Sequence, residues 1–303
     1  MTATHESHRE GSIVVPDASS IRNVVVVGAG QMGSGIAQVC AQAGRTVWLT
    51  DAADSALDRA RTGITTSAGK LHAKGAIDDA AKAGAESITY EASLDAIPWD
   101  SIDIAIEAIV ELEDAKRELL IALDQRLPET ALLASNTSSI SITRLAAATQ
   151  RAPRVIGMHF MNPVPVLELV EVIAGLDTAP AVVDVIAAFA RDLGKVPVIA
   201  SDQPGFITNR ILMPMINEAF VCLHEGVGTP EAIDDAMRLG MRHPLGPLAL
   251  ADLIGLDTCL SIMDVLHRDL GDGKYRPSPL LRQYVDAGRL GRKSGRGVYE
   301  YNR

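Results

Sequence analysis

Short apolar runs rich in β-branched residues alternate with helical patterns along the first two thirds of the chain. Residues 24–27 are continuously apolar, as is typical of a strand buried on both faces of a sheet. A helical pattern follows over 31–43 and ends at Gly44. Further strands are predicted over 46–50, 88–90, 102–106, 131–134, 155–158, 167–173 and 196–199, and further helices over 112–127, 141–148 and 181–193. This alternation predicts an α/β fold with a doubly wound, largely parallel sheet.

An Ala-rich segment over 54–82 interrupts the alternation. Its pattern is helical and is broken near Gly75, which predicts a helical hairpin inserted between two strands. After Pro204 the strand pattern stops, apart from a short strand expected near Tyr299. The rest of the chain therefore predicts an all-helical C-terminal domain.

The predicted C-terminal domain starts with a helix over 206–225 whose apolar arc is wider than a surface helix needs. Pro214 lies inside this helix and is expected to kink it. Thr229 and Pro230 are an N-cap and a first-turn residue, and so predict the start of the next helix. Further helices are expected over 247–254, 256–270 and 279–287. The wide apolar arc favours a homodimer formed through this domain.

These patterns divide the chain into a mostly polar tail over 1–20, expected to be disordered, and two domains over 21–203 and 204–303. Two domains agree with a length of 303 residues, since one domain usually holds about 100–200. The tail has neither the apolar centre of a signal peptide nor the composition of a transit peptide. No run is long or apolar enough to cross a bilayer, so no membrane partner is expected.

Charge and cysteine usage narrow the class of protein further. The formal net charge of −10 argues against a nucleic-acid partner. The three cysteines are Cys40, Cys222 and Cys259, far apart and without metal-ligand spacing. They fit free thiols in a reducing compartment, so a cytoplasmic location is expected. No two of the seven histidines are four residues apart, and no metal site is predicted.

A glycine pattern, Gly28-x-Gly30-x-x-Gly33, lies between the first predicted strand and the first predicted helix. Such glycines allow a tight turn and a close approach of backbone to a pyrophosphate, as in Rossmann-type domains. Asp51 ends the second strand, where a carboxylate would bind the adenosine ribose and repel a 2′-phosphate. NAD is therefore favoured over NADP as the cofactor. The alternative to a cofactor site is a structural turn with a solvated Asp51, which the combined pattern disfavours.

Three polar residues follow or interrupt apolar strands downstream. Ser138 and His159 come at the carboxyl ends of predicted strands, where open α/β sheets bind ligands. Glu171 lies within an apolar run, with Glu168 expected on the opposite strand face. Alone, these would be a loop serine, a structural histidine and two solvated carboxylates on an edge strand. Their shared location favours an imidazole that exchanges protons and is oriented by Glu171, beside a dinucleotide. That combination is what hydride transfer requires.

The glycine turn and these polar residues belong to a longer set of motifs. The set comprises residues 27–33, 107–111, 135–139, 159–165, 169–172, 204–210, 255–258 and 292–299. In this order the motifs resemble those of the L-3-hydroxyacyl-CoA dehydrogenases, including the short-chain 3-hydroxybutyryl-CoA dehydrogenases. The resemblance covers about 23–301 and implies reversible, NAD-dependent oxidation of an acyl-CoA substrate in a cleft between the two domains.

The resemblance also implies roles for single residues. His159 would be the catalytic base paired with Glu171, Ser138 would bind the substrate's 3-oxygen, and Asn209 would orient the substrate. The implied cofactor contacts are Gly28, Gly30, Gln31, Met32, Gly33, Asp51, Glu111, Lys116, Ser138 and Asn162. Ser67 and Lys74 on the inserted hairpin would meet CoA, although Gly69 and Gly75 interrupt the hairpin, and two solvated lysines at 70 and 74 are the alternative.

Two other functions compete with this interpretation. One is a dehydrogenase of a free 3-hydroxy acid on the same scaffold. The other is a non-catalytic NAD-binding protein, like the lens crystallin relatives of the family. Such a protein needs the glycine turn but not Ser138, His159, Glu171 and Asn209 together, and the presence of all four favours an enzyme.

Overall fold

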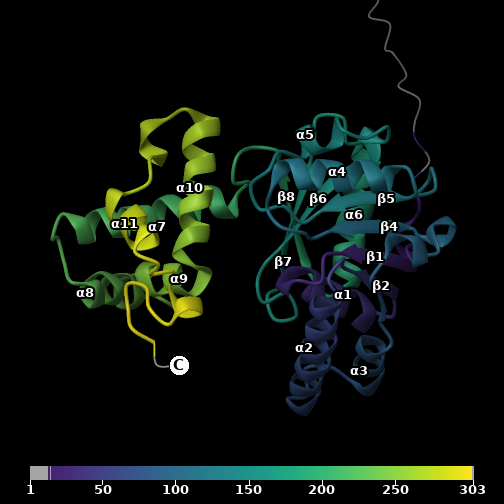
Figure 1. Cartoon of the computed structure of the whole chain (residues 1–303), viewed down its shortest axis with the longest axis horizontal. Coiled ribbons are helices and arrows are strands. Elements are labelled where there is room, and N and C mark those ends of the chain that lie inside the picture. The colour runs from purple at the N-terminus through teal and green to yellow at the C-terminus, as the bar shows by residue number, and fades with distance from the viewer. Residues whose placement is uncertain (1–12, 14, 302–303) are drawn as a thin grey trace, which may run out of the picture. The chain divides into compact units, whose positions relative to one another are not determined.

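The structure is a computed structural model that describes residue 13 and residues 15–301. The described residues form two compact units, which divide between Asp202 and Gln203 (Figure 1). The first unit holds the sheet and the second is helical. The predicted α/β fold followed by a helical domain is confirmed.

The first unit is built on one eight-stranded sheet with the order β3-β2-β1-β4-β5-β6-β7-β8. Its strands are β1 (Asn23–Val27), β2 (Thr46–Thr50), β3 (Thr89–Glu91), β4 (Ile104–Glu107), β5 (Leu132–Ser135), β6 (Val155–Phe160), β7 (Leu169–Ala174) and β8 (Val196–Ser201). Neighbouring strands are parallel except β6 and β7, which are antiparallel. The strand order reverses at β1, between β2 and β4, and open α/β sheets bind ligands beyond the carboxyl ends of such strands.

Helices cover both faces of this sheet (Figure 1). On one face, Val24 and Val26 pack with residues of α1 (Gln31–Gln42) and α6 (Pro180–Asp192). α4 (Glu113–Asp124) contacts β4 and β5, and α5 (Ile142–Ala146) contacts β6, on the opposite face. Burial on both sides explains why residues 24–27 of β1 and 104–106 of β4 are all apolar.

The inserted helical hairpin consists of α2 (Asp54–Ala73) and α3 (Asp79–Glu86), and both helices contact α1. Gly75, with φ of +69°, turns the chain between them, as the sequence predicts. α2 continues without interruption through Gly69, contrary to expectation. Its buried face, which includes Ile64 and Ala68, explains why one glycine does not end the helix.

Part of the predicted disordered tail is ordered. A 3₁₀ turn, η1 (Ala18–Ser20), is capped by Asp17 and contacts α6, and Ala18 is buried. Ile13 and Val15 pack against the core of the first unit. These apolar contacts hold the segment in place. The remaining tail residues, 1–12 and 14, lie outside the described part of the chain.

In the second unit, the described residues include five α-helices, which pack around a core of their own. They are α7 (Thr208–His224), α8 (Pro230–Asp235), α9 (Pro247–Ile254), α10 (Leu256–Leu270) and α11 (Pro279–Asp286). Thr229 caps α8 through its side chain, as predicted, and Pro214 lies inside α7.

The strand expected near Tyr299 is absent from the described residues, where only isolated bridges join Gly291, Arg296 and Glu300. Buried Asp252 accepts hydrogen bonds from the backbone N–H groups of Val298 and Tyr299, both at 2.9 Å. The donors that a strand would use for pairing are therefore held by a carboxylate.

Candidate functional site

The three glycines of the turn after β1 lie in different surroundings. Gly28 has φ of +106°, and a Cβ there would lie 2.5 Å from the carbonyl oxygen of Ala108. A Cβ on Gly33 would lie 1.7 Å from the Gly28 oxygen, so α1 could not approach the turn with any other residue. At Gly30 an added Cβ would meet nothing within 4 Å. The turn is thus closely packed from behind and open at Gly30, beside the N-terminus of α1, an arrangement that suits a phosphate.

Asp51 directly follows β2 beside this turn. Its Oδ2 accepts a hydrogen bond from the backbone N–H of Ala29 at 2.8 Å, and its Oδ1 accepts one from Ala53 at 2.9 Å. The carboxylate borders two cavities, which extend in different directions from the glycine turn.

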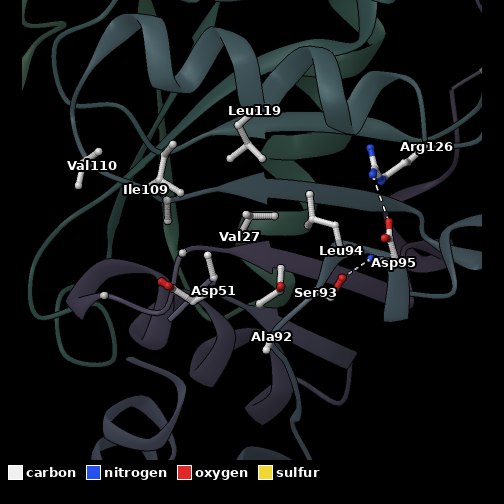
Figure 2. Close-up of a pocket in the computed structure, with 15 residues that line it drawn as sticks. Val27, Asp51, Ala92, Ser93, Leu94, Asp95, Ile109, Val110, Leu119 and Arg126 are labelled. Carbon is white, nitrogen blue, oxygen red and sulfur yellow. Dashed lines mark hydrogen bonds and ion pairs between the residues drawn. The ribbon is translucent and has the colours of Figure 1, made fainter. Parts of the chain in front are cut away.

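The first cavity, of about 660 Å³, extends from the turn towards the loop after β3 (Figure 2). Its wall is mostly apolar and includes Val27, Ala92, Leu94, Ile109, Val110 and Leu119. Asp51 contributes a carboxylate, and Arg126 is held by Asp95 at 3.2 Å. Apolar walls for an adenine ring, a carboxylate for a ribose and an open Gly30 for the phosphates together fit an NAD molecule.

The carboxylate of Glu111 accepts hydrogen bonds from the loop after β5. Its Oε1 lies 2.6 Å from the Thr137 hydroxyl, 2.7 Å from the Ser138 backbone nitrogen and 3.0 Å from the Ser138 hydroxyl. Its Oε2 lies 3.2 Å from Nζ of Lys116. Burial raises the pKa of the Glu111 carboxyl, but the Lys116 charge and the hydrogen bonds outweigh it and leave the pKa below its usual value.

Lys116 and Glu107 form a buried ion pair behind Glu111. Their side chains are 1% and 0% exposed, and Nζ lies 2.5 Å from Oε1 of Glu107. The second oxygen of Glu107 accepts a hydrogen bond from the Ser135 hydroxyl at 2.5 Å. Sequence analysis did not single out Glu107 as a site residue. Its signal is a carboxylate at the end of an otherwise apolar, fully buried strand.

His159 and Glu171 are register partners in the antiparallel β6–β7 pair. Nδ1 of His159 lies 2.7 Å from Oε2 of Glu171, and both residues are buried. β7 lies between β6 and β8, so the alternative that placed Glu171 on an edge strand is wrong. Glu168 precedes β7 and is exposed. Asn136 joins the strand ends, since its Oδ1 accepts a hydrogen bond from the Phe160 backbone.

The second cavity, of about 510 Å³, lies between α1, α2 and the 162–165 loop. Ser67 and Asn162 line it together with Gln31 and Arg59. Lys74 is not among the lining residues; it is the exposed C-cap residue of α2. The structure thus brings Ser67 and Asn162 to one cavity but not Lys74.

The remaining predicted residues lie as follows. Met32 is half-buried in the first turn of α1. Asn209 is buried in α7 of the second unit. Within the described residues, no group of three or more His, Cys, Asp or Glu side chains could hold a metal ion. No helix in that part of the chain is both long and apolar enough to span a membrane.

Comparison with known protein families assigns both units. The model for the 3-hydroxyacyl-CoA dehydrogenase NAD-binding domain matches residues 23–203, and the model for the C-terminal domain of the same enzymes matches residues 205–301. The chain belongs to the 3-hydroxyacyl-CoA dehydrogenase family. The family resemblance is thereby confirmed, and the first unit is the family's NAD-binding domain.

Individual relatives match nearly the whole chain. The 3-hydroxybutyryl-CoA dehydrogenase of Bradyrhizobium diazoefficiens is 53% identical over 288 residues, which cover 94% of this chain and 97% of that relative. The crystal structure of (S)-3-hydroxybutyryl-CoA dehydrogenase from Ralstonia eutropha matches this chain with 50% sequence identity and a TM-score of 0.88. The match covers 94% of this chain and 100% of that protein's chain. A diketoreductase structure is 31% identical, with a TM-score of 0.80, and covers 93% of this chain and 99% of its own.

Proposed function

We propose that the protein interconverts L-3-hydroxyacyl-CoA and 3-ketoacyl-CoA with NAD, and that it prefers short acyl groups such as 3-hydroxybutyryl and acetoacetyl. The observation that supports this most is the buried pair of His159 and Glu171, 2.7 Å apart, in a chain that carries the family's NAD-binding domain. The names of relatives that are at least 50% identical support the short-chain preference.

The residues that would hold NAD surround the glycine turn. The turn that Gly28 and Gly33 make possible would receive the pyrophosphate at Gly30, and Gln31 and Met32 would contribute from the start of α1. Asp51 would bind the adenosine ribose. Glu111, Ser138 and Asn162 would contact the cofactor's nicotinamide half. Lys116, which was expected to be a further contact, is buried behind Glu111 and would act through that carboxylate. When bound, NAD supplies the hydride acceptor for the oxidation and the hydride donor for the reduction.

His159 is the proposed acid–base group. Its Nδ1 faces Glu171, so Nε2 is the nitrogen that would take the proton from the substrate's 3-hydroxyl. The Glu171 carboxylate would fix the ring tautomer and stabilise the imidazolium. Groups in this role typically contribute about 10²–10⁴-fold to the rate. In the reductive direction, protonated His159 would return the proton to the 3-oxygen.

Ser138 is the proposed ligand of the 3-oxygen. Its hydroxyl donates to Glu111 at 3.0 Å. Because the 3-hydroxyl gives its single hydrogen to His159, the Ser138 hydroxyl would turn and donate a hydrogen bond to the 3-oxygen. Asn209 of the second unit would orient the substrate further. Holding reacting groups in place in this way can remove a large part of a reaction barrier.

The second cavity is the proposed site for part of the CoA moiety. Ser67 offers a hydroxyl and Arg59 a guanidinium at its wall. Lys74, at the end of α2, would act outside this cavity on the phosphates of CoA. An acidic protein needs local positive charge for an anionic substrate, and α2 provides Arg59 near its start and Lys74 at its C-cap.

We further propose a cytoplasmic homodimer formed through the second unit. That unit exposes Ile211, Val227, Leu239 and Met241. Near Val227 lies a largely apolar cavity of about 480 Å³, lined by Met215, Cys222 and Met237 among others. Apolar surface of this extent is typical of protein–protein contacts. The three cysteines are free thiols, which fits a reducing compartment.

Oxidation of NADH with acetoacetyl-CoA, followed as the loss of NADH absorbance, tests the proposal. Turnover with acetoacetyl-CoA and much less with free acetoacetate is expected. Preference for the free acid would favour the second candidate, a CoA-independent dehydrogenase, which the similarity to a diketoreductase makes worth testing. NADH binding without turnover of either substrate would indicate a non-catalytic relative.

A further inference from the structure

Glu107 is a buried carboxylate that none of the roles above uses. It is the last residue of β4, is fully buried, and follows three buried apolar residues. A carboxylate in such a place is costly unless each oxygen has partners. Both oxygens do have partners, and the partners lead to the same segment of chain.

The first connection is direct. Oε2 of Glu107 accepts the hydrogen bond from the Ser135 hydroxyl at 2.5 Å. The Ser135 oxygen in turn accepts a hydrogen bond from the backbone N–H of Thr137 at 3.2 Å. One oxygen of Glu107 therefore holds the end of β5 and the start of the loop that follows it.

The second connection passes through Lys116. Oε1 of Glu107 lies 2.5 Å from Nζ of Lys116, and it also accepts a hydrogen bond from the Ile109 backbone at 2.8 Å. Nζ of Lys116 lies 3.2 Å from Oε2 of Glu111. Oε1 of Glu111 accepts a hydrogen bond from the Ser138 hydroxyl. Oε1 of Glu107 is thus connected to the same loop through Lys116 and Glu111.

Electrostatics explains why Glu107 is needed for this connection. Lys116 is 1% exposed, and a buried ammonium is strongly disfavoured without a nearby negative charge. Glu111 alone is partly exposed and lies farther from Nζ than Glu107 does. Glu107 is therefore the nearer of the two carboxylates that hold the Lys116 side chain in place, and Lys116 directs the Glu111 carboxylate towards the loop.

We propose that Glu107 is a positioning residue that fixes residues 135–139 through Ser135 and through the Lys116–Glu111 pair, and so sets the direction of the Ser138 hydroxyl. The proposal rests on the proposed function for the kinetic consequence but not for the structural one. Loss of Glu107 should disturb the orientation of the 3-oxygen more than the binding of NADH or of CoA.

The variant Glu107→Gln tests this, because the amide keeps the shape and removes the charge. With acetoacetyl-CoA we expect kcat to fall by about tenfold or more, while KM and the Kd for NADH change by less than about threefold. In a Ser138→Ala background the same substitution should change kcat by less than about twofold, since the two residues act on one group. Multiplicative effects of the two substitutions on kcat, or an unchanged kcat in the single variant, would overturn the proposal.

Asp124→Asn is the matched control. Asp124 pairs with Arg151 at 2.5 Å, both side chains are 10% exposed, and the pair holds Leu127 and Pro128 before β5 rather than the loop after it. Asp124→Asn should lower Tm and leave kcat unchanged. If Glu107→Gln does not fold, Glu107→Gln/Lys116→Met removes both buried charges. The same loss of kcat is expected, because Glu111 then has no cation to direct it towards the loop.

A crystal structure of the Glu107→Gln variant separates this inference from the proposed function. Wild-type protein that is inactive with acyl-CoA would disprove the proposed function alone. The inference would then be decided by the positions of Glu111 and Ser138. Displacement of the Glu111 carboxylate or rotation of the Ser138 hydroxyl supports it, and an unchanged 135–139 segment contradicts it.

Discussion

The carboxylate of Asp51 accepts a hydrogen bond from the backbone N–H of Ala29 at 2.8 Å, which ties the end of β2 to the glycine turn after β1. Its other oxygen holds the N–H of Ala53. Asp51 is therefore kept in one orientation by the backbone on both sides. A carboxylate fixed in this way gives the turn a local negative charge that a ligand must accommodate.

The first prediction concerns the choice of cofactor. Wild-type protein should prefer NADH to NADPH, because a 2′-phosphate would lie against Asp51. Asp51→Asn keeps an acceptor oxygen for Ala29 but removes the charge, so the preference should shrink by about tenfold or more in kcat/KM with acetoacetyl-CoA. A wild-type preference for NADPH would disprove the role of Asp51.

The second prediction concerns the acid–base pair. His159→Gln should lower kcat by about 10²–10⁴-fold and leave the Kd for NADH nearly unchanged. Glu171→Gln should also lower kcat, since a neutral amide cannot stabilise the imidazolium. Steady-state kinetics and NADH fluorescence titration measure the two quantities. A loss of less than about tenfold for His159→Gln would remove this residue from the mechanism.

The third prediction concerns CoA. Lys74→Ala should raise KM for acetoacetyl-CoA with little change in kcat, which is the effect of losing an interaction present in both the ground state and the transition state. KM for acetoacetyl-pantetheine, which lacks the adenosine phosphates, should scarcely change. Lys82→Ala on α3 is the control, since Lys82 already pairs with Glu86. Equal effects of Lys74→Ala on both substrates would mean that CoA is bound elsewhere.

The fourth prediction concerns assembly. Light scattering at micromolar concentration should give the mass of a dimer. Val227 is 71% exposed at the apolar cavity of the second unit, so Val227→Glu should weaken the dimer. Leu176→Glu, at a residue that is 83% exposed in the first unit, should leave the mass unchanged. A strictly monomeric wild-type protein would contradict the proposed homodimer.

The fifth prediction concerns stability in alkaline solution. Burial and the hydrogen bond to Asp252 raise the pKa of Tyr301 to about 12, from an ordinary value of 10. A raised pKa in the folded state stabilises the protein fully below pH 10, and this contribution is lost as the pH rises from 10 to about 12. Tyr301→Phe should therefore show a smaller fall in Tm over this interval than the wild type. The Tm difference between the two proteins should stay constant from about pH 7 to 9, below the range in which tyrosine titrates.

Much of the fold follows from local patterns in the sequence. The apolar run at 24–27, the break at Gly75 and the Thr229 cap each predict an element that the structure contains. The predicted ends coincide with the observed ones at 46–50, 247–254 and 256–270 and elsewhere differ by up to four residues, because end residues depend on tertiary contacts. The strand expected near Tyr299 failed for such a reason, since Asp252 takes its backbone donors from 46 and 47 residues away.

The site was predictable to a different extent. The polar residues at the strand ends are visible in the sequence, and the structure pairs His159 with Glu171. The antiparallel direction of β7 was not predictable, because a buried apolar strand looks alike in both directions. Glu107 was missed because its meaning depends on Lys116 and on Ser135, which is 28 residues away. A buried charge is recognised only when its partners are known.

The antiparallel pairing of β6 and β7 has a consequence for how the protein folds. His159 and Glu171 are only 12 residues apart in the chain, so closing one short hairpin loop brings them together. Glu111 and Ser138 are 27 residues apart and meet only after α4 and β5 are in place. The two halves of the proposed site therefore have different entropic costs of assembly. Pulsed hydrogen exchange during refolding should protect the backbone amides around His159 before those of residues 137–139.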